Sequence, residues 1–403
     1  MNSQHIIKRT VAAPSALGVV CVLALAACGG GGGAMSSGST QLTAQSGEQF
    51  ADTPLVSDKS GVVATTTTID ANLQNPWGIA VAPGLPFWIA DNNSNLSTLY
   101  SGTGTVETGT ITGSNSVGIA IPASAAGVPS NPTGQVYNAT GGFLIQTVNG
   151  MESAQFIYDG EGGTIAAWAA NSGATAVTAY DDGIVNGANH AVYKGLAIGS
   201  VNGATFLYAT DLHNNKIDVF DTNFSKPAAM QGLFVDPTIP AGFVPFGIAA
   251  VSGQLYVTYA KQDSAMHDEV TGPGLGYVDV FSMSGEFVTR FASGGTLNAP
   301  WGIAVAPSGF GSIAGDVLVG NFGDGTINIY TPSGSVGTFV SQLMVTNGGT
   351  LAIPGLWALV FGNGDPDKPL TTLFYTAGFA DQTDGVFGSI GVAAATSTMT
   401  NPY

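Results

Sequence analysis

The chain has 403 residues, of which only 9% are charged and 58 are glycine, so a helix-rich or coiled-coil protein is a poor description of it. Hydrophobic residues make up 44%, which is enough to build a sizeable core and argues against a disordered chain. Acidic residues outnumber basic residues by 26 to 9, and a surface of that sign repels phosphate backbones, so nucleic acid is excluded as an expected partner.

The first 27 residues have the composition of an export signal. Two basic residues precede an apolar run from Val11 to Ala27, and the run gives way to a glycine tract. The sequence Leu-Ala-Ala-Cys, which ends at Cys28, resembles the lipobox of bacterial lipoproteins. This resemblance implies lipidation of Cys28 and, with glycine at the next position, an anchor at the outer membrane of a Gram-negative cell, on either side of it. The alternative is an ordinary secretory signal that contains a chance cysteine.

The remaining chain divides by composition into a linker, a folded part and a tail. Residues 28–58 are rich in Gly, Ser, Thr, Gln and Ala, which predicts a lipidated cysteine followed by a flexible tether. Residues 59–393 are expected to fold as one domain, and residues 394–403 to form a C-terminal tail. Because the two cysteines, Cys21 and Cys28, are consumed by cleavage and lipidation, no disulfide is expected in the folded part.

A short segment recurs six times along the folded part. Residues 77–83 and 301–307 are identical, and weaker copies surround positions 134, 195, 247 and 358, so that the copies are spaced 52 to 61 residues apart. Each unit has room for four short strands, several of which show the period-two alternation of a half-buried strand. The sequence therefore predicts an all-β fold, a six-bladed β-propeller with four-stranded antiparallel blades. Residues 62–69 are expected to add the outer strand of the last blade.

The recurring residues have predicted structural roles. Glycine is expected to permit close approach of the inner strands at the axis, and the aromatic residue before it to pack between neighbouring blades. The alternative role of the aromatic residues is to line an opening for a ligand; these residues are Trp77, Phe246, Trp301 and Trp357. In one copy of the repeat, Lys194 takes the place of the aromatic residue beside the glycine. It is the only basic residue at this position among the six copies. It is either an anchor for an anionic ligand or a packed stem with a solvated head group.

Residues 209–220, Ala-Thr-Asp-Leu-His-Asn-Asn-Lys-Ile-Asp-Val-Phe, resemble an NHL-type propeller repeat. Residues 59–393 as a whole are similar to a family of uncharacterised exported bacterial propeller proteins. This resemblance implies a fold and a location but no known reaction.

Candidate site residues follow from the predicted topology. Loops between the second and third strands are expected on the same face as the loops that lead into each inner strand. The polar residues predicted on that ligand-binding face are Asp91, Asn92, His190, Lys194, Asp211, His213, Asn214, His267, Asn321 and Asp324. Calcium or a transition metal is the conceivable cofactor, with Asp211, His213, His267 and Asp268 as candidate ligands. The alternative is a set of solvated loops, because no catalytic or metal-binding motif is present.

Two functions remain open at this point. The absence of a catalytic motif favours a lipid-anchored binding or scaffold module of the cell envelope, which presents one face to a protein or a small ligand and contacts the membrane through its lipid alone. The alternative is a calcium- or metal-assisted hydrolase or lyase that resembles the propeller lactonases, and fold analogy alone supports it. A quinone-dependent dehydrogenase is disfavoured, because the chain lacks the tryptophan-docking repeat of those enzymes.

Overall fold

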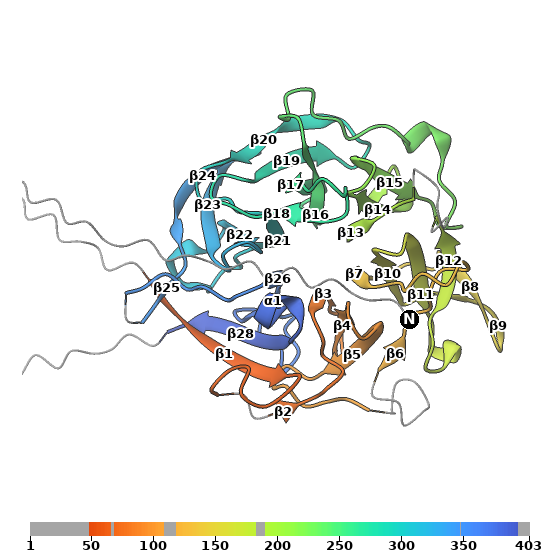
Figure 1. Ribbon diagram of the computed structural model, residues 1–403, viewed down its shortest axis with the longest axis horizontal. Helices are drawn as coiled ribbons and strands as arrows, with labels where there is room; N and C mark the ends of the chain where they lie inside the picture. The colour runs from red at the N-terminus through yellow and green to blue at the C-terminus, as the bar shows by residue number, and fades with distance from the viewer. Residues whose placement is uncertain (1–47, 66–67, 109–117, 183–189, 347, 394–403) are drawn as a thin grey trace, which may run out of the picture. The chain divides into compact units, whose positions relative to one another are not determined.

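The computed structural model describes residues 48–65, 68–108, 118–182, 190–346 and 348–393. These residues form mostly antiparallel sheets arranged as six blades around a central axis (Figure 1), which confirms the predicted six-bladed β-propeller. The expected signal segment, Cys28 and the expected tail at 394–403 lie outside the described residues. No helix in the described part of the chain has the length and hydropathy that crossing a bilayer requires.

The first three blades follow one another along the chain. Blade 1 contains β3 (Pro76–Ala80), β4 (Phe87–Asp91), β5 (Leu96–Tyr100) and β6 (Ile119–Ala120). Blade 2 contains β7 (Pro132–Tyr137), β10 (Phe156–Gly160), β11 (Thr164–Trp168) and β12 (Val177–Asp181), with the separate hairpin β8 (Leu144–Thr147) and β9 (Gly150–Ser153) inserted after its first strand. Blade 3 contains β13 (Tyr193–Val201), β14 (Ala204–Asp211) and β15 (Lys216–Phe220). Within the described residues blade 3 thus has three strands where four were predicted.

The last three blades complete the ring. Blade 4 contains β16 (Phe243–Val251), β17 (Gln254–Gln262), β19 (Tyr277–Ser282) and β20 (Phe287–Ser293), with β18 (Glu269–Val270) paired to β17. Blade 5 contains β21 (Pro300–Val305), β22 (Val317–Asn321), β23 (Ile327–Ser333) and β24 (Val336–Gln342). Blade 6 contains β26 (Leu356–Phe361), β27 (Leu373–Ala377), β28 (Val386–Val392) and β1 (Gln49–Ser57). The short helical segments are η1 (Ala170–Ser172), η2 (Ala228–Met230), η3 (Gly311–Ile313) and α1 (Phe379–Gln382).

The ring is closed by β1, which comes from the start of the described chain and pairs antiparallel with β28 from its end. The strand predicted at residues 62–69 is confirmed only at Thr68–Ile69, which lies outside β1 in the same sheet, and the strand that closes the ring lies instead within the predicted tether of residues 28–58. The two-residue strand β2 (Thr68–Ile69) lies outside β1, and β25 (Met344–Val345) also pairs with β1. In β1, Phe50 and Val56 are buried, whereas Ala51, Asp52 and Thr53 are exposed. The strand thus lacks the regular alternation of apolar and polar residues by which a half-buried strand can be predicted from sequence.

The recurring glycines allow the inner strands of successive blades to approach one another. A Cβ atom on Gly134 would lie 2.2 Å from the amide nitrogen of Leu196 in blade 3, and one on Gly247 would lie 2.2 Å from the carbonyl oxygen of Trp301 in blade 5. Both distances are far below van der Waals contact, and a Cβ atom on Gly78 or Gly302 would lie 2.6 Å or 2.5 Å from a backbone carbonyl oxygen. The predicted role of the glycines is confirmed.

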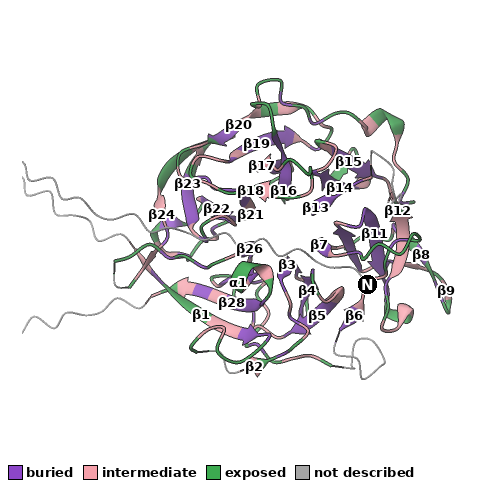
Figure 2. Ribbon diagram, viewed as in Figure 1, coloured by how far each residue is buried: buried purple, intermediate pink, exposed green. Residues whose placement is uncertain are grey.

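The recurring aromatic residues fill the axis. Trp77 stacks on Trp357 with ring centroids 3.4 Å apart, and it also contacts Phe246 from the opposite side of the ring at 6.4 Å. Trp301 lies 5.8 Å from Trp357. These four rings, which we call the axial plug, contact one another across the centre and not only between neighbouring blades, because all four point inward. Trp77, Phe246 and Trp357 are buried, so they do not form an opening for a ligand. Figure 2 shows that the ribbon of the inner strands is largely coloured as buried.

Candidate functional site

The loops that follow the second strands and those that enter the inner strands meet on one face, as predicted. The amide of Asn92 in blade 1 donates to the carbonyl of Asn131 in the loop before blade 2, at 3.1 Å. The amide of Gln262 in blade 4 donates to the carbonyl of Leu212 in blade 3, at 2.7 Å. The amide of Asn93 in blade 1 reaches the carbonyl of Gln382 in blade 6. We call this surface, which lies above the axial plug, the axial face.

A buried lysine stands at the centre of the axial face. The side chain of Lys194, in β13, is 1% exposed, and its Nζ binds the carboxylate of Glu161 from blade 2 and lies 3.1 Å from Oδ1 of Asp268 from blade 4. The same ammonium lies 5.3 Å from the centre of the Trp77 ring. Burial opposes its charge, but Glu161, Glu269 and Asp268 outweigh burial and raise the pKa of Lys194 above its usual value. The lysine is therefore a charged, fully partnered group and not a solvated head group.

Beside the lysine lies a histidine–carboxylate pair. Nδ1 of His267 is 2.9 Å from Oδ1 of Asp268, and the histidine side chain is 44% exposed. The hydrogen bond from His267 lowers the pKa of Asp268, and the same bond raises the pKa of His267. Because Lys194 holds Asp268 and Asp268 holds the imidazole, the orientation of His267 is fixed by charged partners. Such a pair can transfer a proton to or from a molecule on the axial face.

Glu269, next to this pair in the sequence, has an unusual protonation equilibrium. Burial raises the pKa of Glu269 to about 7, and the nearby Lys194 opposes this only in part. In the folded state the carboxyl holds its proton more tightly than in the unfolded chain, where glutamate titrates near pH ~4.3. The stability that this proton provides is present at low pH and is lost as the pH rises from about 4 to about 7.

We therefore predict that a Glu269→Gln variant loses less stability between pH 5 and pH 8 than the wild type. Between pH 5 and pH 8, the free energy of unfolding of the wild type is expected to fall by on the order of 2 kcal/mol more than that of the variant. Urea denaturation of both proteins at both pH values measures this. The exposed Glu286 of the same blade provides the control, and Glu286→Gln is expected to follow the wild type. Equal pH dependence of the wild type and Glu269→Gln would contradict the prediction.

The predicted metal ligands are only partly brought together. Within the described ranges, one group of three potential metal ligands comes together. It consists of Glu161, His267 and Asp268, whose ligand atoms lie within 4.8 Å of one another. His267 and Asp268 of the predicted set belong to it, whereas Asp211 and His213 do not. The ammonium of Lys194 binds both carboxylates of this group, so a cation already occupies the position that a metal ion would need. These residues do not fit a metal centre.

The histidines and polar residues of blade 3 make other contacts. Asp211 is buried and accepts hydrogen bonds from the backbone of Val192 and from the amide of Asn214, so it shapes the loop. The rings of His190 and His213 contact each other with centroids 4.4 Å apart. Nδ1 of His213 lies 3.1 Å from the carbonyl oxygen of Met266, which joins this loop to the one that carries the histidine–carboxylate pair.

The other predicted site residues mainly hold loops in place. Asp91 is buried and accepts a hydrogen bond from the backbone of Thr98. Asn321 is buried and donates to the carbonyl of Thr296, and Asp324 accepts from the hydroxyl of Thr326. Asn92 contributes to the charged cluster, because its amide donates to Oε2 of Glu161 at 3.0 Å.

A cavity of about 300 Å³ opens on the axial face between blades 4, 5 and 6. Residues that line it include Thr271, Phe322, Pro354, Gly378, Asp381 and Gln382. The Phe322 ring stacks on Trp357 of the axial plug with centroids 4.1 Å apart, so the cavity lies beside the closed end of the axis. In Figure 1 α1, which carries two of these residues, lies near the centre of the ring.

The segment α1 has an unusual backbone. Ala380, Asp381 and Gln382 have φ values of 51°, 53° and 64°, which is the left-handed region that non-glycine residues rarely adopt. This conformation costs roughly 1–2 kcal/mol per residue. The turn is held from outside by Asn75, whose amide donates to Oε1 of Gln382 at 3.2 Å, and by Asn93.

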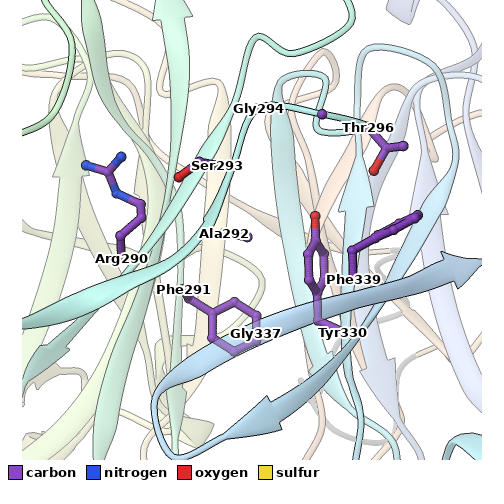
Figure 3. Close-up of a pocket in the computed structure, with 10 residues that line it drawn as sticks. Arg290, Phe291, Ala292, Ser293, Gly294, Thr296, Tyr330, Gly337 and Phe339 are labelled. Atoms are coloured by element: carbon purple, nitrogen blue, oxygen red, sulfur yellow. The ribbon is translucent and has the colours of Figure 1, made fainter.

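A second cavity of about 440 Å³ lies on the side of the propeller, between β20 of blade 4 and β23 and β24 of blade 5. Figure 3 shows Tyr330 and Phe339 together on one side of it and Arg290 on the other. Arg290 is already paired with Asp236 and Asp279. This cavity is a groove between neighbouring blades, and none of the predicted site residues lines it.

The sequence did not single out Glu161, Glu269, Phe322, Asp381 and Gln382 among the other loop residues of the predicted face. Glu161 lies in the turn between the second and third strands of blade 2, so the predicted topology placed it on the axial face, but a glutamate flanked by glycines is also an ordinary turn residue. The contacts that single out these residues join different blades, and a repeat pattern carries no information about them.

The chain has relatives among viral proteins. No protein-family model matches it. It is 34% identical over 342 residues to the Acanthamoeba polyphaga mimivirus protein "Uncharacterized protein R648", covering 83% of this chain and 78% of that protein. It is also 34% identical over 330 residues to "Uncharacterized protein L690" of the same virus, covering 80% of this chain and 81% of that protein. The bacterial origin that the sequence resemblance implied finds no support in these viral relatives.

Solved β-propellers resemble the chain in fold. Virginiamycin B lyase from Staphylococcus aureus matches it with a TM-score of 0.46 at 16% identity, covering 86% of this chain and 99% of the lyase. A likeness at this level says nothing about the activity of the chain. The sequence identity to the two viral proteins extends over most of each chain. The chain therefore belongs to the protein family that contains R648 and L690 of Acanthamoeba polyphaga mimivirus.

Proposed function

We propose that this protein is a binding module that takes up a small molecule on its axial face. The observation that carries the proposal is the cavity of about 300 Å³ walled by loops from blades 4, 5 and 6. Its volume suits a small ligand, and it lies beside the axis of the propeller, where loops distant in sequence converge. Because the axial plug fills the axis beside it, a ligand enters and leaves from this face and does not pass through the ring.

The left-handed turn of α1 supports this proposal. Three consecutive strained residues persist only where the surrounding structure enforces them, and such strain is concentrated at functional sites. Here Asn75 and Asn93 of blade 1 hold Gln382 in place, while Asp381 and Gln382 line the cavity. A turn with glycine at these positions would avoid the cost, so the retained side chains are consistent with a role in contact with a ligand.

A hydrolase or lyase is the second candidate function, and the His267–Asp268 pair favours it. The pair sits on the axial face with an oriented, half-exposed imidazole, which is the arrangement that general acid–base catalysis uses. Glu269, with a pKa of about 7, provides a second group that exchanges protons near neutral pH. Because the ammonium of Lys194 occupies the position that a metal ion would need, a reaction at this pair would depend on proton transfer.

One experiment tests both functions. The purified protein is incubated with a metabolite extract, and the retained and converted compounds are identified by mass spectrometry. We expect at least one compound to be retained by the wild type and lost with Phe322→Ala, while Phe339→Ala, which alters an exposed phenylalanine of the same blade, retains it. A product that disappears with His267→Gln would establish the second function. Retention of nothing, or equal loss in both phenylalanine variants, would refute the binding proposal.

The location is also proposed from the sequence. The Leu-Ala-Ala-Cys segment supports a lipid anchor at Cys28 that holds the propeller at a membrane of the cell envelope. Labelling of cells with a fatty-acid analogue tests this, because a Cys28→Ser variant should lose the label. Unchanged labelling of that variant would exclude the anchor.

A further inference from the structure

We propose that the cavity on the axial face selects a small cation, specifically an alkylammonium group, with Asp381 as its counter-ion and the Phe322 ring as its aromatic partner. This inference rests on the proposed binding function and adds the class of ligand. Among the residues that line the cavity, Asp381 is the one ionisable side chain, and none of them is basic. The cavity therefore offers an anionic group and no fixed cation to neutralise it.

The surroundings of the cavity add negative charge. Carboxylates in the loops of the axial face include Glu161, Asp263, Asp268 and Asp324. Of the lysines near these loops, Lys194 is paired with Glu161 and Asp268, Lys59 is paired with Asp384, and Lys261 donates to the carbonyl oxygen of Ala241. The whole chain has a formal net charge of −17. A face of this sign attracts cations and repels phosphates and carboxylates, so an anionic ligand is disfavoured.

The aromatic residues provide the second component of the site. Trp77, Trp357 and Phe322 form a continuous stack, with centroid separations of 3.4 Å and 4.1 Å. At the Trp77 end of this stack, the ammonium of Lys194 already lies 5.3 Å from the ring centre. At the other end, Phe322 lines the cavity and is only partly buried. An ammonium ligand over Phe322 would repeat, at the open end of the stack, the contact that the protein makes at its closed end.

The charge of the ligand can be tested with two probes of the same shape. Choline carries a trimethylammonium group, and 3,3-dimethylbutan-1-ol is its neutral isostere. Isothermal titration calorimetry of the purified protein is expected to show choline binding about tenfold more tightly than the alcohol, because a carboxylate and a ring face both favour the cation. Higher salt should weaken the binding of choline and leave that of the alcohol unchanged.

Two variants assign the effect to this cavity. Asp381→Asn is expected to lower the affinity for choline about tenfold without changing that for the alcohol. Asparagine adopts the left-handed conformation readily, so this variant should keep the turn and fold normally. Phe322→Leu keeps an apolar side chain but removes the ring, and it should also weaken choline binding, whereas Phe339→Leu on the outer strand of blade 5 should not.

The possible outcomes separate this inference from the function on which it rests. Equal affinity for choline and the alcohol, no binding of choline, or binding of choline that survives Asp381→Asn would each overturn the selection of a cation. The proposed binding function would then still stand or fall with the metabolite experiment and the Phe322→Ala variant. If that experiment retains only neutral or anionic compounds, the cavity is functional but the class of ligand is wrong.

Discussion

Replacement of Gly247 by alanine is expected to destabilise the protein by about 3 kcal/mol, at the upper end of the cost of overpacking. The new Cβ atom would lie 2.2 Å from the carbonyl oxygen of Trp301 and 3.0 Å from Oγ1 of Thr258. The first of these atoms belongs to the backbone of the neighbouring inner strand, so it cannot move away without shifting blade 5 against blade 4. The backbone amide of Gly247 also donates to the Thr258 hydroxyl, and that hydrogen bond would be strained.

Urea denaturation of two glycine variants measures this effect. Gly391 in β28 provides the matched control, because it is also a strand glycine and a Cβ atom there would meet nothing within 4 Å. Gly391→Ala is expected to change the free energy of unfolding by less than about 0.5 kcal/mol. If the two variants are equally stable, the inner strands are not packed as closely as described.

Deletion of residues 1–57 is expected to abolish cooperative folding, whereas deletion of residues 1–47 leaves the propeller intact. The longer deletion removes β1, which pairs with β28 from Phe50 to Ser57. The Phe50 ring is 1% exposed and lies 5.2 Å from that of Phe310. Loss of a buried phenylalanine alone costs about 3–5 kcal/mol, and the deletion also exposes the edge of β28. The total approaches the roughly 5–15 kcal/mol by which domains are usually stable.

Thermal unfolding and size-exclusion chromatography distinguish the two deletions. The shorter one removes no described residue and should unfold in a single transition at the wild-type temperature. The longer one should show a broad transition and self-association through the open edge of blade 6. The milder variant Phe50→Ala should fall between them. A cooperative, monomeric protein without β1 would show that the ring does not depend on this closure.

The repeats made the fold predictable. Each copy of the recurring segment marks an inner strand, because the crowding at the axis demands glycine and the filling of the axis demands large inward side chains. The strand β1 escaped prediction since it lacks this segment and is an outer strand. Three of its residues face solvent, and Pro54 lies where its register with β28 shifts. Outer strands need little apolar surface, so composition placed β1 in the tether.

The candidate site was predictable only in part. Lys194 was identifiable because it replaces an aromatic residue in the repeat, but its partners lie 33 and 74 positions away in the sequence. No spacing rule connects residues on three different blades. The left-handed turn at Ala380 was equally hidden, because none of its three residues is glycine and the conformation is imposed by asparagine side chains from blade 1.

The pairing of β1 with β28 has a consequence for the order of events during biosynthesis. The ribosome makes β1 before any blade, yet the strand on which it docks is made more than 300 residues later. Bringing together segments so far apart in the chain carries the entropic cost of a long loop, and contacts of this kind form late in folding. The first strand of the propeller to be translated must therefore wait, unpaired with its partner, until nearly the whole chain has emerged.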